Sequence, residues 1–206
     1  MAAQDTGNGV AIINGGRNAI YTKVPSHVST PSVPSDPQLV KIYSNLGTGK
    51  NVYNGIGGYG ILGKNAGQPW PESVARGFRP TANHTVTEID LGITYVQGTN
   101  IVVVSLNEND AKNHIPGKAL HTWRFKNLPA FGTCCTLQVA KFAKGIPVKK
   151  GLMYWVVVSP DQQFQDTYDV WNNDANGQQG PFSNNIGSGW EKQSLQQLAN
   201  FGVFGR

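Results

Sequence analysis

Apolar and polar residues alternate along several stretches of the chain, as they do in strands that bury one face. The clearest stretch is 88–95, where one side carries Ile89, Leu91, Ile93 and Tyr95 and the other carries Glu88, Asp90 and Thr94. A second pattern is continuous, because residues 152–158 (LMYWVVV) are all apolar and rich in aromatic and β-branched side chains. This run predicts a strand that is buried on both faces, with Trp155 in the core.

Further short strands are predicted between turns rich in Gly, Asn and Pro. They fall at 39–46, 74–78, 101–106, 118–125, 133–142 and 201–204. Only 191–199 (EKQSLQQLA) has the spacing and propensity of a helix. Strands at such near-regular intervals predict an all-β fold, a jelly-roll-like two-sheet antiparallel sandwich.

Residues 1–37 differ from the rest of the chain. They contain four prolines after position 24, which exclude a helix and favour an extended linker, and two strand-like pieces at 10–13 and 19–24. We therefore expect an extended Pro/Ser/Gly-rich N-terminal tail or linker over 1–37. The remaining residues, 38–206, are expected to form one β-sandwich domain, which is long enough to bury a core.

Composition and charge narrow the possible partners. Charged residues make up only 14% of the chain, and the formal net charge is +5. Lysines at 141, 144, 149 and 150 predict a mildly basic face, which either attracts an anionic polymer or guards a sheet edge against pairing. The shortness of the basic runs favours the second reading. No recognition helix or RNA-binding signature is present, so no nucleic-acid partner is expected.

The sequence predicts no targeting or membrane-spanning segment. No apolar run approaches 18 residues, so no membrane insertion is expected. The first residues lack the basic segment and apolar core of a signal peptide, and no hydrophobic anchor precedes Gly205-Arg206. The low charge and many Asn and Thr residues still favour a protein that works outside the cell.

The order of several motifs resembles a known family. The motifs are Phe78-Arg79-Pro80 before the strand TVTEIDLGITYVQGTN, a strand ending VSL, an Asn/Asp loop ending Ile115-Pro116-Gly117, NLPAFGTCCTLQ, GIPVKKGLMYWVVV, the Trp171 segment, Gly189-Trp190 and a terminal FGVFG. Over about 39–205 this series resembles the bacterial choice-of-anchor domains, most closely the type called choice-of-anchor R. The resemblance implies an extracellular or cell-surface β-sandwich in a bacterium, and it carries over no catalytic residues.

The tryptophans are the best candidates for a binding site. Trp171 is followed by Asn172, Asn173 and Asp174, which predicts a ligand-binding cluster for carbohydrate. An aromatic plane beside amides and a carboxylate can stack on a sugar and bind its hydroxyls. The alternative is that Trp171 belongs to the core, as most tryptophans in sandwiches do.

The two cysteines, Cys134 and Cys135, are adjacent in the sequence. They form either a vicinal disulfide, a possible apolar platform in its loop, or two free thiols at the start of a strand. Adjacent cysteines cannot supply a tetrahedral zinc site, and the four scattered histidines do not suggest one, so no metal is expected. The loop 107–110 with Asn113 is rich in oxygen ligands, but it lacks the order of a calcium-binding loop, and a polar turn is favoured. No cofactor is therefore expected.

Function can be predicted only as a class. The first hypothesis is a non-catalytic protein that binds carbohydrate or another surface polymer. The second is a self-assembling structural subunit, of a fibre or a surface layer, joined to copies of itself through residues 1–37 by strand addition. An enzyme is not expected, because the 12 acidic residues are not placed as the carboxylate pair that glycoside hydrolysis needs.

Overall fold

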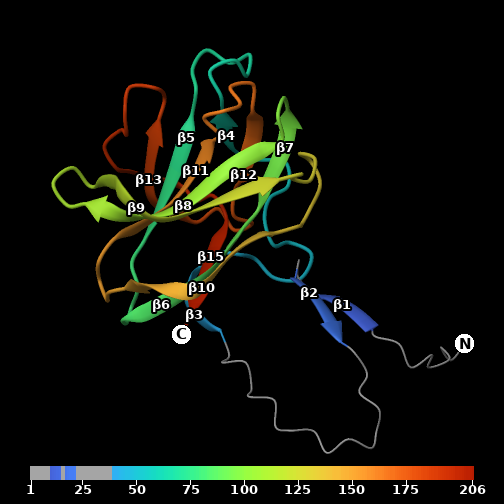
Figure 1. Cartoon of the computed structure of the whole chain (residues 1–206), viewed down its shortest axis with the longest axis vertical. Helices are drawn as coiled ribbons and strands as arrows, with labels where there is room; N and C mark the ends of the chain where they lie inside the picture. Colours follow the sequence, from blue (N-terminus) through green and yellow to red (C-terminus); the bar gives the residue numbers. More distant parts are fainter. Residues whose placement is uncertain (1–9, 15–16, 22–38) are drawn as a thin grey trace, which may run out of the picture.

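The computed structural model describes residues 10–14, 17–21 and 39–206 (Figure 1). These residues form strands and no helix, and all the strand ladders are antiparallel. The strands that follow residue 39 form two layers of sheet, which pack face to face. The predicted all-β, two-sheet antiparallel sandwich is thereby confirmed. No helix in the described part of the chain could cross a membrane.

The larger layer is a six-stranded sheet with the order β14–β13–β5–β11–β8–β9. Its strands are β5 (Ser73–Phe78), β8 (Ile101–Asp110), β9 (Ile115–Lys126), β11 (Tyr154–Pro160), β13 (Gln179–Asn185) and β14 (Ser194–Gln197). The apolar run 152–158 largely becomes β11, which is a central strand paired with β5 and β8. A central position accounts for its lack of polar residues, because both of its faces are covered.

The second layer consists of two smaller sheets. A four-stranded sheet has the order β10–β6–β15–β3, and a three-stranded sheet has the order β4–β12–β7. Their strands are β3 (Val40–Ser44), β6 (His84–Leu91), β10 (Gln138–Val148), β15 (Phe201–Gly205), β4 (Gly58–Leu62), β7 (Ile93–Gln97) and β12 (Tyr168–Asn172). Both sheets send apolar side chains into the same core as the six-stranded sheet.

Side chains of alternate residues divide the six-stranded sheet into two apolar faces. On β11, Tyr154, Val156 and Val158 enter the core between the layers. Trp155 and Val157 point to the opposite, outer face, where they form a second cluster with Ala75 and Met153. We call the cluster of Ala75, Met153, Trp155 and Val157 the outer cluster. Trp155 has no exposed surface, as its sequence context predicts.

Gly92 is the point at which the chain passes from the four-stranded to the three-stranded sheet, between β6 and β7. The side chain of Asn200 holds the backbone there. Its Oδ1 accepts a hydrogen bond from the Gly92 N–H at 2.6 Å, and its Nδ2 donates to the carbonyl of Asn172 at 2.7 Å. Buried backbone groups left without a ladder partner are thus satisfied by an amide side chain.

The helix predicted at 191–199 is wrong, whereas the two strand-like pieces predicted near the N-terminus are strands. Residues 191–199 form no helix, and 194–197 instead make the edge strand β14 against β13. In the N-terminal region, β1 (Val10–Asn14) and β2 (Arg17–Tyr21) form a two-stranded antiparallel hairpin. The rest of the predicted tail, 1–9, 15–16 and 22–37, lies outside the described residues.

Candidate functional site

Trp171 lies in the core between the layers. It has no exposed surface, its ring lies 6.0 Å from that of Phe201, and its Nε1 donates a hydrogen bond to the carbonyl of Asn200 at 2.7 Å. An indole that is covered on every side cannot stack on a sugar ring. This burial corrects the interpretation of Trp171 as a ligand-stacking residue and leaves it as a core residue.

The polar residues after Trp171 serve the fold in the same way. The Asn172 side chain is fully buried; it accepts a hydrogen bond from the Thr94 hydroxyl at 2.8 Å and donates to the Asn54 carbonyl at 3.0 Å. Asn173 forms an isolated bridge with Ala199. The buried Asn172 amide thus joins a loop to the strands inside the molecule, and neither it nor Trp171 is open to a sugar.

Asp174 is buried as well, and its carboxylate organises the loop that follows it. Its Oδ2 accepts hydrogen bonds from the backbone N–H groups of Asn176 and Gln178, each at 3.0 Å. Its charge also acts on Arg76, whose guanidinium is fully buried between two aromatic rings. Burial lowers the pKa of Arg76 to about 10, partly offset by neighbours that include Asp174. Asp174 therefore has an interior structural role.

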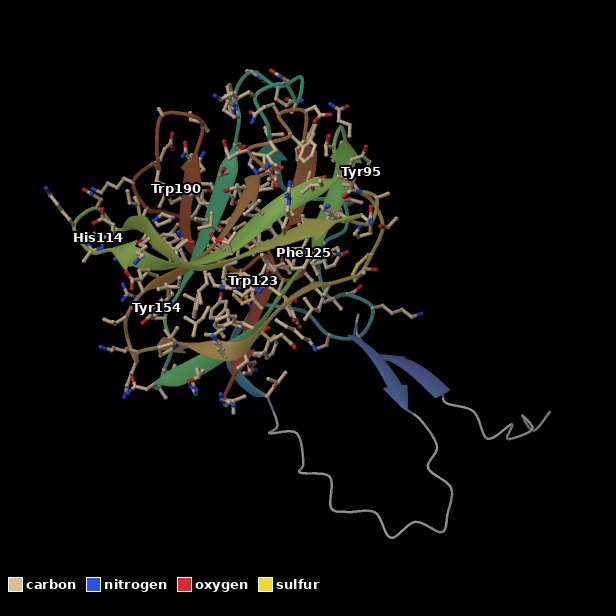
Figure 2. The ribbon with its side chains drawn as sticks, in the orientation of Figure 1. Tyr95, His114, Trp123, Phe125, Tyr154 and Trp190 are labelled. Carbon is tan, nitrogen blue, oxygen red and sulfur yellow. A yellow bond between two sulfur atoms is a disulfide. The ribbon has the colours of Figure 1, made fainter. Side chains whose placement is uncertain are left out.

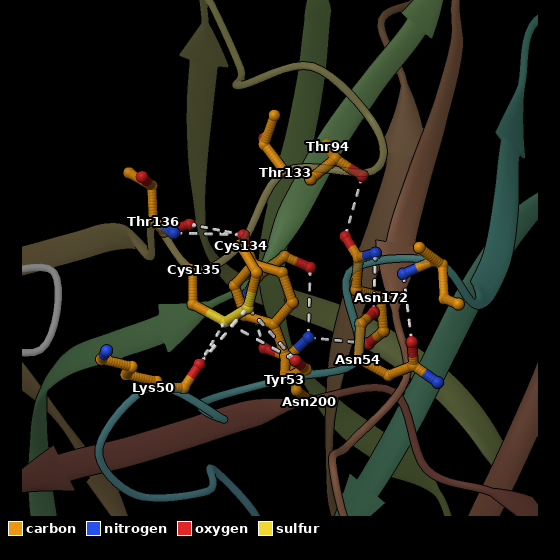
Figure 3. Close-up of a disulfide and its surroundings, with 12 residues drawn as sticks. Lys50, Tyr53, Asn54, Thr94, Thr133, Cys134, Cys135, Thr136, Asn172 and Asn200 are labelled. Atoms are coloured by element: carbon orange, nitrogen blue, oxygen red, sulfur yellow. Dashed lines mark hydrogen bonds between the residues drawn. A yellow bond between two sulfur atoms is a disulfide. The ribbon is translucent and has the colours of Figure 1, made fainter.

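The cysteine pair lies in the loop between β9 and β10 and is drawn as a disulfide between Cys134 and Cys135 (Figure 3). Its sulfur atoms lie 3.4–3.8 Å from the carbonyl oxygens of Lys50 and Tyr53. These are contacts rather than hydrogen bonds, because a disulfide sulfur carries no proton. The Tyr53 hydroxyl accepts a hydrogen bond from the Thr136 N–H at 3.1 Å. The loop that carries the pair thus packs against residues 50–53 and is joined to Tyr53 by the hydrogen bond from Thr136.

A hollow of about 500 Å³ lies beside Trp190, outside the six-stranded sheet. Its lining residues are Lys112, Asn113, His114, Ile115, Trp190 and Lys192. The partly buried indole of Trp190 packs against the outer cluster. One side of the indole therefore packs against the outer cluster, while another side lines the hollow. We call this hollow the Trp190 hollow.

A hydrogen-bonded loop sets the position of Trp190. Gly187 and Gly189 have φ angles of 104° and 109°, which glycine adopts readily and other residues rarely do. Their N–H groups donate to the Oδ1 of Asn185 at 2.9 and 3.1 Å, and Asn185 also forms an isolated bridge with Trp190. The indole is consequently carried by a loop with internal restraints.

The opposite wall of the Trp190 hollow is the tip of the β8–β9 hairpin. Asp110 fixes this tip, because its Oδ1 accepts hydrogen bonds from the N–H groups of Lys112 and Asn113 at 2.9 and 3.2 Å. Hydrogen bonds from Asn113 and Lys112 hold the pKa of Asp110 below its usual value. Trp155 supports the hairpin from below, since its Nε1 donates to the Asn109 Oδ1 at 2.9 Å.

At the hairpin tip, Asp110 closes a polar turn. Both carboxylate oxygens of Asp110 are engaged within the turn, Oδ2 by the Asn113 side chain at 2.8 Å. This is the polar turn that the sequence favours. Among the described residues, no group of three or more His, Cys, Asp or Glu side chains is placed to hold a metal ion.

The chemistry of the Trp190 hollow is aromatic and cationic. Two lysines and a histidine surround the indole, and the described lining contains no carboxylate. The sequence analysis missed this site, because the hairpin tip and the Trp190 loop are about 75 residues apart and nothing local links them. A signal was nevertheless present in Gly189-Trp190 with Lys192 close behind.

Comparisons of the chain with protein-family models, curated proteins and solved structures found no match. The resemblance to choice-of-anchor domains therefore stays a prediction carried by the motifs themselves.

Proposed function

We propose that this protein is a non-catalytic binding module for an acidic carbohydrate polymer, at the surface or outside of a bacterial cell. The observation that carries the proposal is the Trp190 hollow, where a braced indole lies among Lys112, Lys192 and His114. The net charge of +5 has the sign that attracts such a polymer.

Each part of the hollow matches a part of an acidic sugar. The C–H face of a pyranose ring packs on an indole, which offers a large rigid surface at little cost in conformational entropy. Lysine ammonium groups pair with a sugar carboxylate, and the amide of Asn113 can bind hydroxyls as donor or acceptor. Glycoside hydrolysis needs two opposed carboxylates, and the lining described above offers none, which favours binding over cleavage.

Isothermal titration with polygalacturonate, a polymer of uronic acid, tests the proposal. We expect Trp190→Ala to weaken binding on the order of 30-fold, as for a loss of about 2 kcal/mol at an interaction hot spot. The matched control is Trp70→Ala, because Trp70 is 50% exposed and does not line the Trp190 hollow. Binding should also weaken as salt is added.

Three outcomes would contradict this assignment. They are equal losses in the two tryptophan variants, equal binding of the neutral polymer dextran, and tighter binding of duplex DNA. Equal losses would show that Trp190 does not mark the binding site. Equal binding of dextran would show that the charge of the polymer is not needed. Tighter binding of DNA would show that the ligand is not a carbohydrate.

Self-assembly through the N-terminal tail is a second candidate function. Strands β1 and β2 pair with each other and with no other described strand, so both outer edges of this hairpin are open to strand addition. Light scattering on the full chain beside residues 38–206 tests it. Assembly that requires the tail supports this function, and the same number of subunits per particle in both proteins excludes it.

A further inference from the structure

A second hollow of about 320 Å³ lies on the other side of the β8–β9 hairpin tip. Its lining includes Arg79, Glu108, His114, Leu152, Met153 and Tyr154. His114 therefore lines both hollows. Figure 2 shows Trp190, His114 and Tyr154 on the same side of the molecule, with His114 the farthest out of the three. We call this hollow the Arg79 hollow.

The two hollows also share the apolar residues that lie beneath them. Met153 lines the Arg79 hollow and belongs to the outer cluster, against which Trp190 packs. One apolar layer thus runs under both hollows, and the hairpin tip with His114 stands between them. A ligand that extends from one hollow to the other would cross the molecule at His114.

The Arg79 hollow shares two features with the Trp190 hollow, an apolar surface and a cation. Leu152 is 52% exposed and, with Met153, offers an apolar surface. Arg79 supplies the cation, and its guanidinium is oriented by a hydrogen bond to the Gly151 carbonyl at 2.8 Å. The two hollows differ in that Leu152 and Met153 take the place of the indole, and in that Glu108 adds a carboxylate, which can accept hydrogen bonds from sugar hydroxyls. An apolar surface with a cation occurs twice, as a polymer of identical acidic units would require.

From this repetition we infer that the ligand is a linear chain of acidic sugar units that occupies both hollows at once, with His114 between the two subsites. The inference rests on the proposed function and adds the length and the path of the ligand. Binding of the second unit is intramolecular once the first is bound, so affinity rises steeply when the chain spans both subsites.

Titrations with galacturonate oligomers of increasing length test this inference. We expect affinity to increase at least about tenfold over a narrow range of lengths. Arg79→Gln should lower the affinity of the long oligomers about tenfold and leave that of the shortest binding oligomer unchanged. The control is Lys41→Gln, which removes the same charge from β3 in the other layer. Melting temperatures should be equal in all three proteins, because both residues are exposed.

The outcomes separate this inference from the proposed function. If Trp190→Ala abolishes binding but affinity rises smoothly with length and Arg79→Gln has no effect, the second subsite is wrong and the Trp190 hollow stands. If Arg79→Gln and Lys41→Gln weaken binding equally, only the net charge matters and the second subsite is again wrong. If no oligomer or polymer binds, the proposed function itself fails.

Discussion

Two tryptophans show how burial decides the role of a residue. Trp171 has no exposed surface and donates to a backbone carbonyl, whereas Trp190 is braced on one side and lines a hollow on the other. Their neighbours in the sequence suggest the reverse, because the asparagines that follow Trp171 look like sugar ligands. The Asn172 amide instead donates to the backbone carbonyl of Asn54 inside the molecule. Truncating a core tryptophan typically costs about 3–5 kcal/mol, so Trp171 is needed for folding before any question of binding arises.

Asp169 is a buried acid that makes stability depend on pH. It is fully buried on β12, opposite Ile61 and Tyr95, and neither of its carboxyl oxygens has a hydrogen-bond partner among the described residues. Burial raises its pKa from 3.8 to about 7. Because the folded pKa lies above the unfolded one, folding favours the protonated form. The stabilisation is complete below pH 3.8 and is lost as pH rises through about 7.

We therefore expect the free energy of unfolding to fall between about pH 4 and pH 7, relative to the variant Asp169→Asn. The fall is at most about 4 kcal/mol, since a difference of one in pKa corresponds to about 1.4 kcal/mol. Urea unfolding of both proteins across this range measures it, and the comparison cancels other titrating groups. Parallel stability curves for the two proteins would show that Asp169 does not titrate in this way.

At the scale of elements, the local sequence pattern predicts where strands lie, but it does not predict which strands pair or what covers them. The run 152–158 predicts a doubly buried strand, because continuous apolar sequence needs cover on both faces, and residues 154–158 of β11 confirm it. Residues 191–199 have good helix propensity, yet 194–197 pair with the edge of β13, which offers backbone hydrogen bonds. The polar side of 88–95 was expected from alternation, but not that Asp90 would be completely buried. That depends on what covers the sheet, which local sequence does not encode.

Gly92 tests the junction between the two smaller sheets. A Cβ at this position would lie 2.4 Å from a ring carbon of Tyr53 and 2.7 Å from the Asn200 Nδ2. Gly92→Ala should therefore destabilise the protein by about 3 kcal/mol or more, because the ring and the amide have no room to move apart. Thermal unfolding measures the loss.

The control for this substitution is Gly60→Ala. Its Cβ would meet only the flexible side chain of Leu62, at 3.2 Å. We expect a much smaller effect, since that side chain can shift. Equal effects of the two substitutions would mean that the junction at Gly92 is not specifically packed.

At the scale of the whole molecule, the sandwich brings distant segments together at one edge. The hairpin tip at 110–114 and the loop at 185–190 belong to different ends of the six-stranded sheet order, yet both stand over the outer cluster. The fold class follows from the pattern of strands along the sequence. The proximity of the hairpin tip and the 185–190 loop follows from the order of the strands in the sheet. For that reason the candidate site could be found only in the structure, whereas the proposed class of function was already a hypothesis from the sequence.

The most direct test of the Trp190 hollow is the indole region of a ¹H–¹⁵N correlation spectrum, recorded while polygalacturonate oligomers are added. The five tryptophans give five indole signals, and Trp190→Phe assigns the one that matters. We predict that the Trp190 signal shifts with saturation while that of Trp171, which lies in the core between the layers, stays in place. A saturable shift of the Trp70 or Trp123 signal with an unmoved Trp190 signal would contradict the account.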